Sequence, residues 1–177
     1  MMKIYAIRHG LTEMNKKGLI NGHLDEDLAP EGIEQAKAII PFVPDTIKRI
    51  YCSSLKRARH TAEIINEELK LPITYHDELR EVDFGTLNGT PFLDSQREKH
   101  KIGNYDWREF GGESAEGVKE RVLKILAKIK AENKSEEALI VTHGGVIRLL
   151  YLLTLGEHID NIDNVSIHSF DMDKIFK

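Results

Sequence analysis

The stretch KIYAIRHG, residues 3–10, runs from an apolar segment into an arginine, a histidine and a glycine. A second stretch, ALIVTHGG at residues 138–145, also passes from apolar residues to a histidine followed by glycine. Short apolar runs are typical of buried strands, and ligands bind at the carboxyl ends of the strands in an open parallel sheet. We therefore expect His9 and His143 at the same edge of one sheet, within a few ångströms of each other.

The rest of the sequence alternates segments typical of strands with segments typical of helices. Strands are predicted at residues 3–8, 49–53, 73–76, 138–145 and 164–173. Apolar residues with helical spacing predict helices at residues 30–40, 55–69, 118–129 and 146–155. Ser54 is expected to cap the second of these helices, and Gly156 to end the last. This alternation predicts an α/β fold, with a mostly parallel sheet flanked by helices.

Residues 84–114 have no clean periodicity and include Trp107, the only tryptophan. We interpret this segment as an excursion or cap over a site. Its basic residues at 97–101 are expected to form a solvated surface, although they could instead meet a second anionic group of a substrate. Because there is no linker and no repeat, the 177 residues are expected to form one domain, 1–177.

Composition and charge argue against several classes of protein. The net charge of −4 disfavours a nucleic acid or a membrane surface as the main partner, because such partners usually require a basic face. Cys52 is the only cysteine, so an internal disulfide is impossible and a reducing compartment is expected. No signal peptide is evident, because Arg8 and His9 interrupt the first apolar run, and no stretch is long enough to span a membrane. We expect a cytoplasmic monomer or homodimer.

Basic side chains at the ends of the predicted strands suit a tetrahedral dianion. Arg8 carries a planar fork of donors that matches phosphate oxygens. Arg57 lies in the first turn of a predicted helix, where the helix dipole also favours an anion. The glycines after His9 and His143 let backbone N–H groups approach a ligand. Arg8, Arg57 and His143 are therefore expected to form a phosphate pocket.

Each of these residues also has a structural interpretation when taken alone. A strand-end histidine more often makes structural contacts, and Arg57 could be a solvated helix residue, as Lys56 and Arg59 are expected to be. A structural role is expected for the other histidines: His23, His60, His76, His100, His158 and His168. No spacing of histidine, cysteine or carboxylate residues matches a zinc site, so neither a metal nor another cofactor is predicted.

Six blocks in a fixed order give the sequence a family resemblance. It resembles the histidine phosphatase superfamily, which includes the cofactor-dependent phosphoglycerate mutases and whose hallmark is Arg-His-Gly near the N-terminus. The blocks are RHGLTEMN (8–15), NGHLDEDLAPEGIEQA (21–36), YCSSLKRARHTAEII (51–65), LREVDFGTLNG (79–89), GGESAEGVKERV (111–122) and VTHGGVIRLL (141–150). The resemblance implies a three-layer α/β sandwich of the phosphoglycerate mutase type, with a short cap.

The resemblance also implies a role for each matching residue. His9 would be the nucleophile that forms a phosphohistidine, and Glu81 would donate a proton to the leaving group. Arg8, Arg57 and His143 would hold the transferring phosphoryl group. The further positions that would bind phosphate or substrate are Asn15, Asn21, Gly22 and Gly144, while Glu113 and Ser114 would support the site.

General physical chemistry sets conditions on this mechanism. His9 must be neutral at its attacking nitrogen, which nearby arginines favour, and its other ring nitrogen should donate to a backbone carbonyl. Glu81 needs a raised pKa to act as an acid, so partial burial is expected. The positive side chains can neutralise the phosphoryl oxygens without a metal ion.

The leading functional hypothesis is a metal-independent phosphatase for small phosphorylated metabolites, either of broad specificity or acting on a sugar phosphate or α-ribazole phosphate. The alternatives are a bisphosphoglycerate-dependent phosphoglycerate mutase and an inactive phosphate-binding module. The short cap, of mixed charge, favours the phosphatase over the mutase, and the intact catalytic set argues against the binding module. Four departures from the family pattern leave the substrate open: Leu11, Asn21, Ala29 and Asn88.

Overall fold

In the computed structural model, which describes residues 2–133 and 136–176, five strands form one sheet in the order β3-β2-β4-β1-β5. The strands are β1 (Lys3–Arg8), β2 (Ile47–Ser53), β3 (Ile73–His76), β4 (Glu137–Thr142) and β5 (Ile167–Asp171). β4 pairs in parallel with β1 and β2, β2 pairs in parallel with β3, and β5 runs antiparallel to β1. The prediction of a mostly parallel sheet is therefore confirmed.

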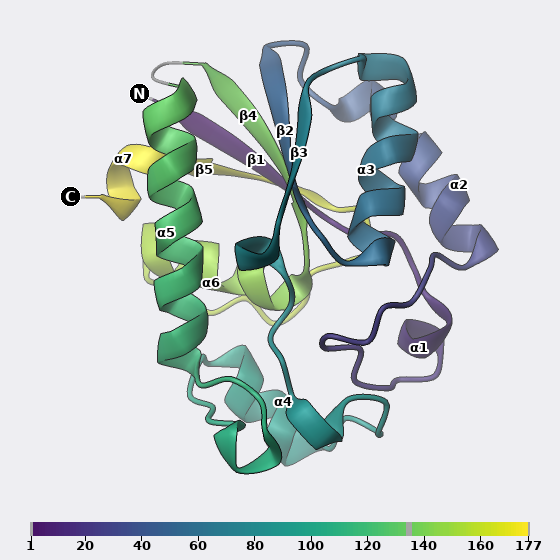
Figure 1. The fold of residues 1–177 in the computed structure, drawn as a ribbon, viewed down its shortest axis with the longest axis vertical. Coiled ribbons are helices and arrows are strands. Elements are labelled where there is room, and N and C mark those ends of the chain that lie inside the picture. Colours follow the sequence, from purple (N-terminus) through teal and green to yellow (C-terminus); the bar gives the residue numbers. More distant parts are fainter. Residues whose placement is uncertain (1, 134–135, 177) are drawn as a thin grey trace.

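Helices cover both faces of this sheet, so the fold has three layers (Figure 1). α2 (Pro30–Ala38) and α3 (Lys56–Leu69) lie on one side, and α5 (Ala115–Asn133) and α6 (Gly144–Leu155) lie on the other. The shorter helices are α1 (Glu13–Lys16), α4 (Asp94–Lys101) and α7 (Met172–Ile175). The three-layer α/β sandwich implied by the sequence is confirmed, and α6 ends directly before Gly156 as predicted.

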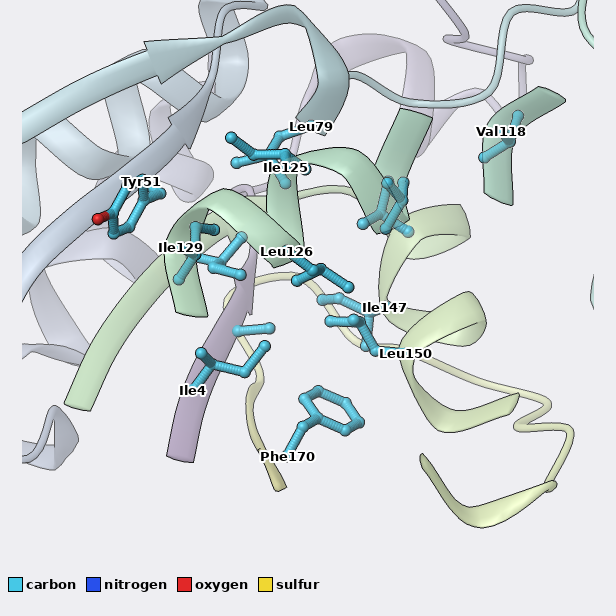
Figure 2. Packing of buried hydrophobic residues seen from close by; sticks show 14 of the residues in the cluster. Ile4, Tyr51, Leu79, Val118, Ile125, Leu126, Ile129, Ile147, Leu150 and Phe170 are labelled. Atoms are coloured by element: carbon cyan, nitrogen blue, oxygen red, sulfur yellow. The ribbon is translucent and has the colours of Figure 1, made fainter. Parts of the chain in front are cut away.

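Alternate residues of the strands pack into two apolar cores, one on each face of the sheet. The larger core, part of which is drawn in Figure 2, includes Ile4, Leu126, Ile129, Ile140 and Ile147. The smaller core includes Ile7, Ala58, Ile65, Leu139 and Val141. Neighbouring residues of a strand point to opposite faces, so a strand covered on both faces must be apolar throughout. β1 and β4 pair along their whole length, with Arg8 opposite Thr142.

Ser54 does not cap α3, so that prediction is wrong. Leu55 occupies the position before α3, and its amide donates to the hydroxyl of Ser53 at 3.3 Å. The Ser54 hydroxyl is engaged elsewhere, because it donates to Asp77 and accepts from Arg80 Nε. Several bounds also differ from the prediction. β2 begins at Ile47 rather than at residue 49, β4 covers 137–142 rather than 138–145, and β5 covers 167–171 rather than 164–173. α2 ends at Ala38 rather than at residue 40, and α5 covers 115–133 rather than 118–129.

The aperiodic segment 84–114 folds over one end of the sheet (Figure 1). It contains α4 and two short 3₁₀ turns, Gly85–Leu87 and Arg108–Phe110. Phe84 and Trp107 are buried, with ring centroids 5.5 Å apart, and they anchor the segment to the larger core. The predicted excursion is confirmed. Its helix was not predicted, because the sequence of α4, DSQREKHK, contains no aliphatic or aromatic apolar residue that could reveal a helical period.

The loop after β1 passes very close to α2. A Cβ atom on Gly10 would lie 2.6 Å from the carbonyl oxygen of Gly32, and one on Gly32 would overlap the carbonyl oxygen of Leu11. These obstacles are backbone atoms, which cannot turn aside as a flexible side chain can. Glycine at both positions therefore lets α2 pack directly against the backbone that follows His9.

We expect Gly32→Ala to destabilise the protein by about 1–3 kcal/mol, because the added methyl group forces α2 away from Leu11. Gly117→Ala is the matched control, since Gly117 also lies in a helix but its nearest neighbour is Ser114 Oγ at 3.5 Å. There the substitution should stabilise by roughly 0.5–1 kcal/mol through helix propensity alone. Urea unfolding measures both changes, and equal stabilisation by the two substitutions would contradict the close packing.

Candidate active site

A cavity of about 560 Å³ opens at the carboxyl ends of β1 and β4, beneath the cap. Eight of the nine site residues predicted from the sequence line it: Arg8, His9, Asn15, Asn21, Gly22, Arg57, Glu81 and Gly144. The ninth, His143, is fully buried and is not part of the wall. The structure thus brings together, in one cavity, residues that lie as far apart in the sequence as Arg8 and Gly144.

The His9 ring is held at both of its nitrogens. Nδ1 lies 2.8 Å from the carbonyl oxygen of Gly10, and Nε2 lies 3.2 Å from Nε of Arg57. A guanidinium nitrogen can only donate, so Nε2 must accept, and the ring proton then belongs to Nδ1 and points to Gly10. The predicted contact with a backbone carbonyl is confirmed. Nε2 is therefore the nitrogen whose lone pair faces the cavity.

His9 is neutral in this environment. Burial lowers the pKa of the ring, and the charges of Arg57 and then Arg8 lower it further, whereas the contact with Gly10 opposes them. The resulting pKa lies well below the ordinary value of 6.5. A protonated ring has no free lone pair, so these neighbours keep a lone pair on the ring at neutral pH.

Arg57 is fully buried, although it carries a charge. Its terminal nitrogens donate to the carbonyl oxygens of Leu24 and Gly22, each at 2.8 Å. Burial lowers the pKa of Arg57 to about 10, which still leaves it charged at neutral pH. Gly22 has φ +46°, and a Cβ atom there would overlap Asn88 Oδ1, so glycine is needed to aim this carbonyl at Arg57.

His143 lies behind His9, with the two ring centroids 5.1 Å apart. This confirms that the ends of β1 and β4 bring the two histidines together. His143 Nε2 is 2.7 Å from Ser53 Oγ, whose hydroxyl already accepts from the amide of Leu55. The Ser53 proton is then available to Nε2, which leaves the His143 ring proton on Nδ1. Nδ1 is buried and has no hydrogen-bond partner in residues 2–133 and 136–176.

Glu81 is partly buried in the cavity wall, as predicted, but its pKa does not behave as predicted. Its carboxylate accepts from the amides of Val82 at 2.9 Å and Gly145 at 3.2 Å. Burial raises the pKa of Glu81, but His100, these two amides and Arg57 together outweigh it. The pKa is therefore lowered, and the expectation of a raised value is wrong for the unliganded protein. The charge interaction with His100 is the largest of the lowering causes, and the hydrogen bonds that the two amides donate to the ionised form come next.

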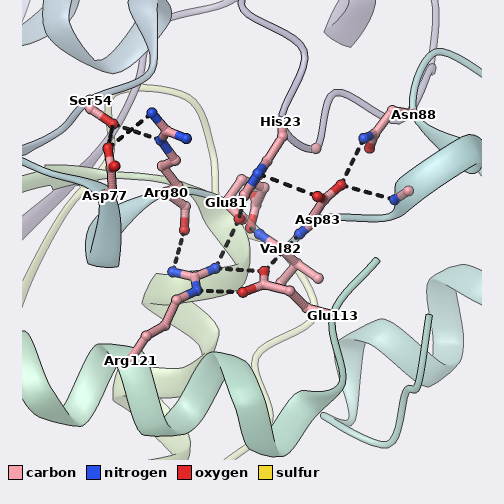
Figure 3. Close-up of polar contacts among 12 residues, drawn as sticks. His23, Ser54, Asp77, Arg80, Glu81, Val82, Asp83, Asn88, Glu113 and Arg121 are labelled. Atoms are coloured by element: carbon pink, nitrogen blue, oxygen red, sulfur yellow. Dashed lines mark hydrogen bonds and ion pairs between the residues drawn. The ribbon is translucent and has the colours of Figure 1, made fainter. Parts of the chain in front are cut away.

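A half-buried ion pair fixes the backbone that carries Glu81 (Figure 3). Arg121 of α5 donates to the carbonyl oxygens of Glu78 and Arg80, each at 2.8 Å, and of Glu81 at 2.9 Å. The same guanidinium pairs with Glu113, whose second oxygen accepts from the amide of Asp83 at 2.9 Å. This arrangement agrees with the supporting role that the resemblance implies for Glu113.

Three further predicted residues complete the phosphate end of the cavity. Asn15 Oδ1 accepts from the Thr12 amide and from Asn164, each at 3.3 Å, so its amide nitrogen remains for a ligand. Asn21 donates to Thr12 Oγ1 at 3.0 Å. Gly144 is the first residue of α6, and an amide at this position has no partner within the helix and favours an anion.

Several residues of the wall were missed in the sequence. α4 contributes Arg97, His100 and Lys101, α6 contributes Arg148, and the following loop contributes Asp160, Asn161, Asp163 and Asn164. His100, for which a structural role was expected, is buried beside Glu81: a Cβ atom on Gly145 would overlap Glu81 Oε1 and lie 3.1 Å from His100 Cε1. No feature of the sequence distinguishes Asn164. If α4 had been predicted, the spacing of Arg97, His100 and Lys101 would have placed these three residues on one face of that helix.

Among residues 2–133 and 136–176, no group of three or more His, Cys, Asp or Glu side chains is arranged to hold a metal ion. His23, for example, contacts the carbonyl oxygen of Glu81 at 2.8 Å instead.

In the same part of the chain, no helix is long and apolar enough to cross a membrane.

Residues 4–175 match the family described as Histidine phosphatase superfamily (branch 1). The chain belongs to this superfamily. It is 31% identical to the adenosylcobalamin/alpha-ribazole phosphatase of Escherichia coli, over 88% of this chain and 80% of that protein. It is 30% identical to the metal-independent phosphoserine phosphatase of Arabidopsis thaliana, over 94% of this chain and 74% of that protein. These relationships identify this histidine phosphatase as a phosphatase enzyme.

The fold of this histidine phosphatase is also found in solved structures. The crystal structure of TTHB049 from Thermus thermophilus superposes with a TM-score of 0.79 at 32% identity. The match covers 96% of this chain and 94% of that one. The sandwich and its cap therefore belong to an established architecture of the superfamily.

The three buried histidines should make stability depend on pH. Burial is the main cause that lowers the pKa values of His9, His143 and His100, the last to about 4, from an ordinary 6.5. Below pH 6.5 the histidines of the unfolded chain bind protons, whereas the buried rings of the folded protein do not. The free energy of unfolding is therefore highest above pH 6.5 and decreases as the pH is lowered. Each ring should contribute about 1.4 kcal/mol per pH unit in this range.

Urea unfolding between pH 7 and pH 5 measures this dependence. His100→Gln removes one of the three rings, so the free energy of unfolding should depend less steeply on pH, by the uptake of one proton. Substitution of the exposed His158 serves as the control and should leave this pH dependence unchanged. An identical slope for wild type and His100→Gln would contradict the protonation states assigned to the buried rings.

Proposed function

We propose that this enzyme hydrolyses small phosphate monoesters through a phosphohistidine on His9, without a metal ion. The observation that carries the proposal is the neutral His9 ring, with its proton directed to Gly10 and its Nε2 lone pair beside Arg57. A nucleophile is thus placed next to a cation that can receive the phosphoryl oxygens. Relatives named as phosphoserine and alpha-ribazole phosphatases give the first substrates to test.

The substrate phosphate would bind between Arg8, Arg57 and the amide of Gly144. Nε of Arg8 is buried and unpartnered in the described part of the chain, so it offers a donor to this group. A phosphoryl oxygen would replace His9 as the acceptor for Arg57 Nε, which releases Nε2 for attack. The arriving dianion also repels the negative charge of Glu81 and raises its pKa, so Glu81 becomes protonated when the substrate binds.

In the first chemical step, Nε2 of His9 attacks phosphorus and the bond to the ester oxygen breaks. Glu81 gives its proton to this oxygen, so the alcohol leaves neutral, while His143 and the arginines hold the three equatorial oxygens. In the second step, the ionised Glu81 takes a proton from water as the water attacks phosphorus. The P–N bond then breaks, and inorganic phosphate and neutral His9 are restored.

The role of Glu81 predicts a difference between two kinds of leaving group. Nitrophenolate leaves without a proton, whereas an alkoxide requires one, so Glu81→Gln should slow phosphorylation by an alkyl phosphate about 10²–10⁴-fold and by nitrophenyl phosphate far less. The variant should therefore release nitrophenol in a burst equal to the enzyme concentration, followed by slow turnover as hydrolysis fails.

Stopped-flow measurement of nitrophenol, with phosphate release from glycerol 3-phosphate alongside, tests this mechanism. All assays should be unaffected by EDTA, because no step requires a metal ion. If Glu81→Gln slows phosphorylation equally with both substrates, another residue must be the acid. Activity that EDTA abolishes and a divalent ion restores would overturn the metal-free proposal.

A further inference from the structure

The turn that precedes β5 has an unusual backbone conformation. It is closed by the amide of Ser166, which donates to the carbonyl oxygen of Asp163 at 3.2 Å, and its third residue, Val165, has φ +57°. Turns with a positive φ at this position usually place glycine or asparagine there, because a β-branched side chain crowds its own backbone. Lys70 is the one other non-glycine residue with a positive φ in the described part of the chain, and it directly follows α3, where this conformation is common. Val165 is therefore strained, and strained residues often lie at functional sites.

Contacts with β1 and with the smaller core hold this turn in place. The amide of Val165 donates to the carbonyl oxygen of Arg8 at 3.0 Å, and its side chain is buried in the smaller core. The carbonyl oxygen of Ile162, just before the turn, accepts from Nη1 of Arg8. Because the turn is attached to Arg8 in this way, the residue before Val165, which is Asn164, lies directly beside His9.

The side chain of Asn164 joins His9 to Asn15. Its Nδ2 donates to the carbonyl oxygen of His9 at 2.9 Å and to Oδ1 of Asn15 at 3.3 Å. A carboxamide nitrogen carries two hydrogens, so both contacts can form at once. Asn164 itself is half-buried in the wall of the cavity. One side chain therefore connects the backbone of the proposed nucleophile to a residue of the phosphate end.

The contact with Asn164 determines which end of the Asn15 carboxamide faces the cavity. Oδ1 of Asn15 accepts from Asn164 and also from the amide of Thr12, at 3.3 Å. If the carboxamide were turned over, its NH₂ group would meet these two donors, and its oxygen would face the bound anion. The two donors therefore keep the Asn15 oxygen away from the phosphate and leave Nδ2 to donate to it.

The contact with the His9 carbonyl oxygen completes a set of backbone restraints around the nucleophile. The amide of His9 donates to the carbonyl oxygen of Thr142 at 2.9 Å. The next amide, that of Gly10, donates to Oγ1 of Thr61 at 2.9 Å. With Asn164 bound to the carbonyl oxygen between them, the peptide groups on both sides of His9 are held. The ring then extends from a fixed backbone, so its Nε2 keeps one position relative to the phosphate.

We propose that Asn164 is a positioning residue, which orients the carboxamide of Asn15 toward the phosphate and holds the backbone of His9 for attack. This inference rests on the proposed phosphatase function and adds to it a residue that acts through Asn15 and His9. The strained conformation of Val165 is what places Asn164 between these two partners. The buried side chain of Val165 and its bond to Arg8 offset the cost of that conformation.

Two single variants test the positioning role. Asn164→Ala removes both contacts, and it should lower kcat/KM for nitrophenyl phosphate by about 10-fold or more, because a small displacement of reacting groups has a large effect on rate. The inhibition constant for orthovanadate, an analogue of the transferring phosphoryl group, should rise as well. Ser166→Ala is the matched control, since its hydroxyl donates within the same turn, to the carbonyl oxygen of Asp163 at 2.6 Å, but not to His9 or Asn15. It should leave both constants unchanged.

A double-mutant cycle with Asn15→Ala separates positioning from a general loosening of the turn. When Asn15 has already lost its carboxamide, Asn164→Ala can disturb only the contact with His9. Its effect on kcat/KM should then be several-fold smaller than in the wild-type background. The same loss in both backgrounds would overturn the action through Asn15. A loss in Ser166→Ala as large as that in Asn164→Ala would assign the effect to the turn and overturn the positioning role.

Failure of this inference and failure of the proposed function give different results. An active wild type whose kcat/KM and orthovanadate inhibition are unchanged by Asn164→Ala overturns the positioning role and leaves the phosphatase proposal standing. A wild type that releases no phosphate from any monoester overturns the proposed function. In that case, weaker binding of orthovanadate to Asn164→Ala than to wild type would still support the orientation of Asn15, and equal binding would overturn it.

Discussion

The buried guanidinium of Arg57 is the constraint on which the site depends. A charge removed from water needs hydrogen-bond partners, and three of the five N–H donors of Arg57 are taken by the carbonyl oxygens of Gly22 and Leu24 and by Nε2 of His9. The same contact that satisfies the arginine fixes the tautomer of His9 and keeps its ring neutral. A phosphate oxygen is a better acceptor for this cation than an imidazole nitrogen, so ligand binding can exchange the partner and release the nucleophile.

The proposed mechanism also requires an acid that changes its protonation state during the reaction. In the unliganded protein, amides of Val82 and Gly145 favour the ionised form of Glu81. The incoming phosphate reverses this preference by repulsion at short range. For such a change to occur without movement of the chain, the backbone of Glu81 must be rigid, and the ion pair of Arg121 with Glu113 provides that rigidity from α5.

The sequence was informative where apolar patterning controls the structure. The apolar runs before His9 and His143 predict two parallel strands, and neighbouring parallel strands must end at the same edge, so the meeting of the two histidines follows from patterning. Patterning does not determine how polar groups share partners. Two predictions were wrong because of contacts between residues that are distant in the sequence. Ser54 does not cap α3, since its hydroxyl binds Asp77, and the pKa of Glu81 is lowered rather than raised. α4 was missed because it is polar throughout, and His100 and Arg97 were missed with it.

The position of the phosphoryl group on His9 tests the account most directly. Rapid quenching of the enzyme during turnover in alkali, where phosphohistidine persists, followed by proteolysis and two-dimensional ³¹P NMR of the His9 peptide, distinguishes the two ring nitrogens. Because Nδ1 is directed at Gly10 and Nε2 faces the cavity, the account predicts phosphate on Nε2 alone. Phosphate on Nδ1, or no phosphate on His9 in an enzyme that is turning over, would contradict it.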